Sequence, residues 1–143
     1  MQHLTTETII NAPIEKVWSI FIDFDSYAEW NPFIKSIEGE MNVGNTLKVV
    51  LALGDKNSIF KPKLLRNEPN KEFRWKGSLG PGGLFDGEHY FLFEQLPDGT
   101  TKFIHGEKFS GLLVWPIMKM VGKDTHIGFN GMNKAIKERC ENK

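Results

Sequence analysis

Three side chains in the second half of the chain have the chemical types that proton transfer needs. His89, His105 and Glu107 stand in two runs of alternating residues, and their alternate neighbours are Phe91, Phe93, Phe103 and Phe109. Histidine exchanges protons near neutral pH, and a carboxylate beside it can accept a proton or a hydrogen bond. An ionisable group on such an apolar face needs a partner or a changed pKa, because burying an unpaired charge is costly.

We predict that His89 and Glu107 lie on adjacent strands and can pair. The residues leave three roles open for such a pair. It can be a structural hydrogen bond that closes the wide end of a sheet, a polar anchor for a ligand's carbonyl or hydroxyl group, or an acid–base couple in catalysis, with His105 as a further candidate. His126 is predicted to lie on the flank or surface of a helix, away from this group.

No bound metal and no cofactor are expected. The sequence has no His-Glu-x-x-His motif, no clustered acidic triad and only one cysteine, Cys140. Neither Ser110 nor Cys140 stands in a motif that marks a nucleophile. A single cysteine also rules out an intrachain disulfide, which fits a reducing, cytoplasmic setting.

The elements that must position these residues begin with a strand and a helical bridge. Leu4 to Ile10 reads as a strand, and Asn11-Ala12-Pro13 is a typical start for a helix that runs to about Asp23. The apolar face of that helix consists of Ile14, Val17, Trp18, Phe21 and Ile22. A second short helix is expected within 24–33, ended by Pro32.

From residue 34 to residue 109 the pattern changes to period two, interrupted by turn residues. The turns are short, so consecutive strands are expected to pair antiparallel. Pro62 places its own strand at an edge or at a bulge. The six strands expected here, seven with the first, are Ile34 to Glu38, Thr46 to Leu53, Ser58 to Asn67, Glu72 to Lys76, Gly87 to Gln95 and Thr101 to Phe109.

The loop from Leu79 to Phe85 is rich in glycine but is not a phosphate-binding loop. It lacks the lysine and hydroxyl of that motif, and no helix follows it directly. We expect either a mobile flap with Leu84 and Phe85 at its tip or a plain hairpin turn.

A long amphipathic helix ends the chain. Steps of three and four residues place eight side chains on one stripe of about seven turns: Val114, Met118, Val121, Thr125, Phe129, Met132, Ile136 and Cys140. Gly122, Gly128 and Gly131 each cost roughly 1 kcal/mol relative to alanine inside a helix. They indicate a bend, close packing of the backbone, or room left for a cavity.

Composition limits the class of protein. A chain of 143 residues fits one domain, here residues 1–143. Lysine plus arginine and aspartate plus glutamate both total 18, so net charge does not favour nucleic acid. No stretch has the apolar length of a membrane span or the pattern of a secretion signal, so we expect a cytoplasmic protein. The sequence does not indicate a protein partner.

Two segments resemble the START-like (SRPBCC) superfamily, particularly its polyketide cyclase/dehydrase-like bacterial subgroup. The first contains Asn11-Ala12-Pro13 with Val17-Trp18 and then Trp30-Asn31-Pro32-Phe33; the second contains Gly87-Glu88-His89-Tyr90-Phe91, followed by Thr101 and Glu107 to Gly111. The resemblance implies an α+β helix-grip fold, in which a seven-stranded curved antiparallel sheet wraps around the C-terminal helix. It also implies a deep apolar cavity between sheet and helix, but no particular reaction.

Three functions follow from this cavity, and the sequence favours the first. The protein binds and possibly transports a hydrophobic small molecule such as a lipid, polyketide or aromatic metabolite. Alternatively, it is a metal-independent cyclase or dehydrase that uses His89, His105 or Glu107, or it is a protein-interaction module with a filled interior. The residues expected to line the cavity are Trp30, Phe33, Phe60, Trp75, His89, Phe91, His105, Glu107, Met118, Val121, Phe129 and Met132.

Overall fold

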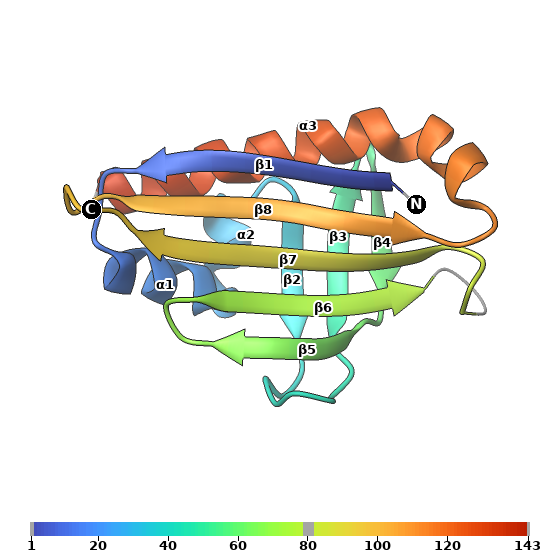
Figure 1. Ribbon diagram of the computed structural model, residues 1–143, viewed down its shortest axis with the longest axis horizontal. Helices are drawn as coiled ribbons and strands as arrows, with labels where there is room; N and C mark the ends of the chain where they lie inside the picture. The colour runs from blue at the N-terminus through green and yellow to red at the C-terminus, as the bar shows by residue number, and fades with distance from the viewer. Residues whose placement is uncertain (1, 79–81, 143) are drawn as a thin grey trace.

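Two antiparallel sheets and a long helix enclose the interior of the protein (Figure 1). The computed structural model describes residues 2–78 and 82–142. The larger sheet has the strand order β1-β8-β7-β6-β5, and the smaller has the order β2-β3-β4. The elements are β1 (Gln2–Ile10), α1 (Ile14–Ile22), η1 (Phe24–Ser26), α2 (Tyr27–Trp30), β2 (Ile34–Glu38), β3 (Lys48–Leu53), β4 (Lys56–Phe60), β5 (Lys63–Glu68), β6 (Glu72–Ser78), β7 (Asp86–Gln95), β8 (Thr101–Ser110) and α3 (Val114–Glu141).

The strand predicted over Ser58 to Asn67 is two strands, which is a correction to the sequence analysis. β4 ends at Phe60 and β5 begins at Lys63, with Lys61 and Pro62 between them. Pro62 has no backbone N–H for a sheet hydrogen bond, but its carbonyl accepts one from Leu47 N at 2.8 Å. β4 pairs with β3 and β5 with β6, so the chain passes from one sheet to the other at Pro62. The described residues therefore form eight strands in two sheets, although both β4 and β5 are edge strands as Pro62 predicted.

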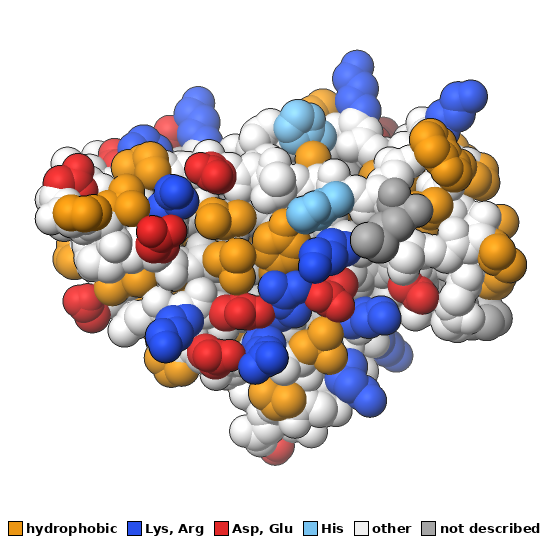
Figure 2. Space-filling model, in the orientation of Figure 1, with side chains coloured by type: hydrophobic (Ala, Val, Ile, Leu, Met, Phe, Trp, Pro, Cys, Tyr) orange, Lys and Arg blue, Asp and Glu red, His pale blue; other side chains and the backbone are white. Residues whose placement is uncertain are grey.

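The register of the larger sheet brings the chemically interesting residues together. β7 and β8 pair with His89 opposite Glu107 and Phe91 opposite His105, and β6 pairs with β7 so that Trp75 is opposite His89. These side chains face the interior. Arg74 lies on the outer face, where its guanidinium contacts Glu72 and Glu88 at 2.6 Å each. Figure 2 shows this face, where acidic and basic side chains lie side by side over β6 and β7.

An aromatic cluster fills the end of the sheet that α1 covers. Phe21 on α1 is fully buried, and its ring centroid lies within 4.8–6.5 Å of seven other rings: Trp18, Phe24, Tyr27, Phe73, Phe91, Phe93 and Phe103. The Tyr27 hydroxyl donates a hydrogen bond to the Phe21 carbonyl at 2.6 Å. Aromatic pairs of this kind add to the stabilisation that burial of their apolar area provides. This end of the protein is therefore a tightly packed hydrophobic core.

α3 packs its predicted stripe against the sheets. Six of the eight stripe residues are buried, and the remaining two, Met118 and Val121, are partly buried. His126 is exposed, as its position off the stripe predicted. Among the described residues, no helix is both long and apolar enough to cross a membrane.

The glycines of α3 differ in their surroundings. A β-carbon on Gly128 would overlap the ring of Phe33, so this glycine allows the helix backbone to lie directly on that ring. A β-carbon on Gly131 would only touch Pro32 Cγ at 3.5 Å, and one on Gly122 would meet Met118 Cε at 3.4 Å. Close backbone packing explains Gly128.

Replacing Gly128 with alanine is therefore expected to destabilise the protein by up to about 2 kcal/mol. Overpacking costs about 1–3 kcal/mol, and the helix propensity of alanine returns only roughly 1 kcal/mol of it. Gly131→Ala is the matched control, and it should be neutral or stabilising by up to about 1 kcal/mol, because its new methyl group finds ordinary van der Waals space. Urea unfolding of both variants tests this, and equal effects would show that Phe33 moves aside without cost.

The loop before β7 is tied to the residues that lead into α3. Leu79, Gly80 and Pro81 lie outside the described residues. Backbone N–H groups of Leu112 and Leu113 donate to the carbonyls of Gly83 and Leu84 at 3.0 and 2.7 Å. The Phe85 ring stacks on Phe109 with centroids 5.8 Å apart. The second half of the predicted flap is thus fixed against β8 and α3.

Candidate functional site

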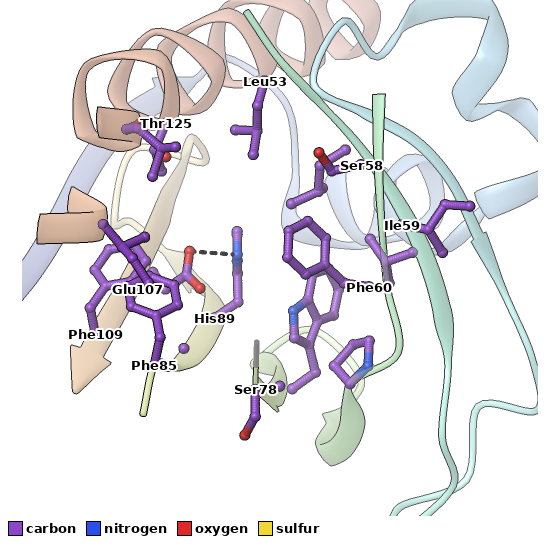
Figure 3. A pocket seen from close by; sticks show the side chains of 18 of the residues that line it. Leu53, Ser58, Ile59, Phe60, Ser78, Phe85, His89, Glu107, Phe109 and Thr125 are labelled. Carbon is purple, nitrogen blue, oxygen red and sulfur yellow. Dashed lines mark hydrogen bonds and ion pairs between the residues drawn. The ribbon is translucent and has the colours of Figure 1, made fainter. Parts of the chain in front are cut away.

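A cavity of about 280 Å³ lies between the two sheets and the N-terminal half of α3. Figure 3 shows its walls, with Phe60, Ile59 and Ser58 on one side and His89, Glu107 and Phe109 on the other. α3 contributes Ile117, Val121 and Thr125 to the lining. The cavity is mostly apolar, and it occupies the end of the protein opposite the aromatic cluster around Phe21.

Six of the residues predicted to line a cavity do so: Phe33, Phe60, Trp75, His89, Glu107 and Val121. The other six do not. Phe91, His105, Phe129 and Met132 are fully buried behind the cavity wall, in the layer where sheet and helix touch. Trp30 packs edge-on against Tyr27, with ring centroids 5.0 Å apart, and Met118 lies next to Gly122 on α3.

The smaller sheet supplies lining residues that sequence reasoning missed. Val49, Leu51 and Leu53 all face the cavity from β3, and Ser58 faces it from β4. Ile59 borders the cavity, but this residue is 61% exposed and its side chain points away from the cavity (Figure 3). The period-two pattern of Val49, Leu51 and Leu53 was visible in the sequence. It did not identify the cavity side, because the fold of β2, β3 and β4 into a separate sheet was not foreseen.

His89 and Glu107 form an ionisable pair within the cavity wall. His89 Nδ1 lies 3.2 Å from Glu107 Oε1 (Figure 3), with the histidine side chain 1% exposed and the glutamate side chain 16% exposed. The two atoms are close, but they are not aligned as a hydrogen bond, and His89 Nδ1 has no hydrogen-bond partner among the described residues. Glu107 is therefore the member of the pair that a molecule in the cavity would touch.

Glycine at position 87 makes space for this carboxylate. A β-carbon on Gly87 would overlap Glu107 Oε2, so the carboxylate can lie across β7 only because no side chain is there. The position of Glu107 thus depends on both of its neighbours on β7, Gly87 and His89.

A chain of buried hydrogen bonds continues behind His89. Its Nε2 lies 2.7 Å from Nε2 of His105, whose Nδ1 lies 3.0 Å from Asn133 Oδ1 on α3. Asn133 Nδ2 donates to Thr6 Oγ1 at 2.7 Å, and the Thr6 hydroxyl donates to the His105 carbonyl at 2.8 Å. Sequence reasoning identified neither Asn133 nor Thr6. A polar residue beside Met132 on the buried side of the helix was the one signal available.

Comparison with known proteins places this architecture in a family. Over residues 1–141 the sequence matches the family described as polyketide cyclase / dehydrase and lipid transport. The chain belongs to this family. No curated protein matches the sequence significantly.

Solved structures with the same fold confirm the helix-grip architecture of this polyketide cyclase/dehydrase family member. The chain is similar to a START superfamily protein from Mycobacterium smegmatis, with 20% identity, a TM-score of 0.72, and 98% of this chain and 97% of that one covered. It is also similar to the Zhui aromatase/cyclase from Streptomyces sp. R1128, with 12% identity, a TM-score of 0.70, and 96% and 94% covered. At these identities the likeness shows the fold alone.

The environment of His105 keeps its imidazole neutral in this family member. Burial lowers the pKa of His105 well below the ordinary value of 6.5, and the neighbouring His89 lowers it further, while the hydrogen bond with Asn133 acts in the opposite direction. Folding therefore holds His105 neutral at pH values at which the unfolded chain would protonate it.

The free energy of unfolding should consequently fall as the pH drops below 6.5, the ordinary pKa of histidine. The contribution from His105 is complete above that pH and decreases by up to about 1.4 kcal/mol per pH unit below it, until the folded protein also binds the proton. Urea unfolding at several pH values measures the slope.

Two variants separate His105 from the other titrating groups. His105→Gln should show a shallower decline in stability with falling pH, because its side chain cannot protonate. His126→Gln changes an exposed histidine of α3 and should keep the slope of the wild type. The same slope in His105→Gln and the wild type would contradict this account.

Proposed function

We propose that this protein binds a small hydrophobic molecule in the cavity between the two sheets and α3, as a carrier of that molecule. The observation that carries the proposal is a mostly apolar lining with one ionisable pair, His89 and Glu107, among the described lining residues. Ligand sites are generally apolar concavities with a few placed polar groups. A lipid, a polyketide or an aromatic metabolite has the matching chemistry.

The volume limits the size of this molecule. At about 280 Å³ the cavity is just below the range of about 300–1,000 Å³ for drug-sized ligands. A cavity of about 150 Å³ is enough for benzene. A molecule with two fused rings, or a lipid segment of similar volume, would fill this one.

A second candidate function is a cyclase- or dehydrase-type enzyme that needs no metal. It is favoured by the approach of His89 and Glu107 to 3.2 Å within the cavity wall, where a carboxylate and an imidazole can exchange a proton with a bound molecule. His105 does not reach the cavity, so it would act only through His89. The third reading, a protein-interaction module, called for a filled interior and an exposed apolar patch. The cavity argues against the filled interior, although Leu112, Trp115 and Met120 are exposed.

Analysis of what the protein carries tests the leading proposal. Organic extraction followed by mass spectrometry, with native mass spectrometry of the intact chain, should reveal a stoichiometric apolar molecule. If the cavity is empty after purification, titration with 1-anilinonaphthalene-8-sulfonate and with naphthalene derivatives should show saturable binding of one molecule per chain. A protein that carries nothing and binds none of these probes would overturn the carrier proposal. Turnover of a bound ketone, lost in Glu107→Gln, would instead favour the enzyme.

A further inference from the structure

We propose that His89 and Glu107 share a single proton, and that they donate it as a hydrogen bond to the carbonyl oxygen of a small apolar ketone or aldehyde in the cavity. This rests on the proposed function, because it concerns the ligand of the same cavity. It goes further by stating which hydrogen-bonding group the ligand must present. The argument follows the direction of each hydrogen bond behind His89.

The direction of the first bonds is fixed by a carbonyl group. The His105 carbonyl can only accept, so the Thr6 hydroxyl must donate its proton to it. Thr6 Oγ1 is then left to accept, and the Asn133 amide must turn its NH₂ group toward it. Asn133 Oδ1 therefore faces His105 and accepts from Nδ1–H of that ring.

The same logic continues through the two histidines. His105 is neutral and carries its proton on Nδ1, so its Nε2 is an acceptor. His89 must then donate from its own Nε2 across the 2.7 Å contact. In a neutral His89 ring, Nδ1 consequently has no proton and presents a lone pair.

This lone pair would face an ionised carboxylate if no further proton were present. His89 Nδ1 and Glu107 Oε1 lie 3.2 Å apart, and two acceptors at that distance in a buried site repel each other. One proton, on His89 Nδ1 or on Glu107, removes the repulsion. The contact lacks hydrogen-bond alignment, so that proton is not held in a well-formed internal bond. Because His89 Nδ1 is buried and the Glu107 side chain is partly exposed, the proton reaches a ligand from Glu107.

Among the described residues that line the cavity, no side chain other than this pair is ionisable at neutral pH. Five rings surround His89, with centroids 4.8 to 6.4 Å from its own: Phe33, Trp75 from β6, Phe91, Phe129 from α3 and the neutral His105 from β8. The rings of Phe91 and His105 are themselves 4.6 Å apart. The hydroxyl of Thr125 on the α3 wall donates to the Val121 carbonyl at 2.8 Å, and that of Ser78 to Asp86 at 2.6 Å. The shared proton is thus one donor among the described lining residues, together with the indole N–H of Trp75 and the hydroxyl of Ser58, and it is the one that Glu107 substitutions remove.

A ligand that meets this donor must present an acceptor, and the rest of it must be apolar. A ketone or aldehyde oxygen only accepts hydrogen bonds, and its hydrocarbon part matches the lining of Val49, Leu51 and Phe60. Without the shared proton, two acceptors would face the carbonyl oxygen. The protein should therefore bind the ketone more tightly than a molecule of the same shape without the carbonyl.

The test uses a pair of probes with nearly the same shape, 2-acetylnaphthalene and 2-isopropylnaphthalene. Calorimetric titration of the full chain at neutral pH is expected to show about tenfold tighter binding of the ketone, which is the contribution of one good hydrogen bond. The carbonyl stretch of the bound ketone should shift to lower wavenumber than that of the free ketone in an apolar solvent.

Two substitutions identify the source of the effect. Glu107→Leu should bind both probes equally. Glu107→Gln keeps an N–H donor at the same place, so it should retain the preference for the ketone. Equal affinity of the wild type for both probes would overturn the shared proton and leave the carrier proposal standing. Failure of a protein that carries no other molecule to bind either of these probes or 1-anilinonaphthalene-8-sulfonate would overturn both proposals.

Discussion

Replacing Val121 with tryptophan is expected to weaken the binding of naphthalene-sized probes by at least about 100-fold. Val121 faces the cavity from α3 and is only partly buried. An indole at this position would project into a space of about 280 Å³ and remove much of it. A loss of 100-fold corresponds to about 2.7 kcal/mol of binding free energy. Burial of a two-ring molecule in an apolar site contributes at least this much, so losing the site can account for the loss.

The stability of Val121→Trp should change little, because the new ring occupies existing space and valine and tryptophan have similar helix propensities. Ile127→Trp provides the control on the same helix, since Ile127 is 59% exposed and does not line the cavity. Its probe affinity should equal that of the wild type. Calorimetric titration and urea unfolding of both variants measure the two quantities. Wild-type affinity in Val121→Trp would show that the probes bind elsewhere.

The pairing of His89 with Glu107 could be predicted from the sequence because it depends on local regularities. Alternation along β7 and β8 places both residues on the inner face, and a short turn between the strands makes them neighbours. The stripe along α3 follows from helical spacing in the same way. Such features need no knowledge of how distant elements meet.

The shape of the cavity depends on contacts between distant elements and could not be predicted. Alternation continues through Pro62, so nothing in the local pattern showed that β4 and β5 belong to different sheets. The separate sheet is what brings Leu51 and Leu53 to face the cavity. Likewise, the stripe of α3 does not reveal where the helix stops touching the sheet. Phe129 and Met132 therefore fall in the packed layer, whereas Val121 lines the open space.

Asn133→Leu is expected to lower the free energy of unfolding by about 2–4 kcal/mol. Asn133 is 4% exposed, and it both accepts from His105 Nδ1 and donates to Thr6 Oγ1. Leucine would leave the buried Nδ1–H of His105 without a partner and would remove the donor to Thr6 Oγ1, which keeps only its bond to the His105 carbonyl. Each such loss costs about 1–3 kcal/mol. The better helix propensity of leucine returns only a few tenths of a kcal/mol. Urea unfolding at pH 7.5 measures the change, and Asn130→Leu, at an exposed position of α3, should leave stability within about 0.5 kcal/mol of the wild type.

A double-mutant cycle distinguishes the hydrogen bond from the general effect of a new side chain. When His105→Phe is combined with Asn133→Leu, the donor and the acceptor disappear together, so the double variant should be more stable than the sum of the single effects predicts by at least about 1 kcal/mol. The reason is that the unsatisfied Nδ1–H of His105, which accounts for much of the loss in Asn133→Leu, no longer exists. Additive effects would mean that Asn133 does not hold the orientation of His105. The inference that His89 donates its hydrogen bond to His105 would then lose its basis.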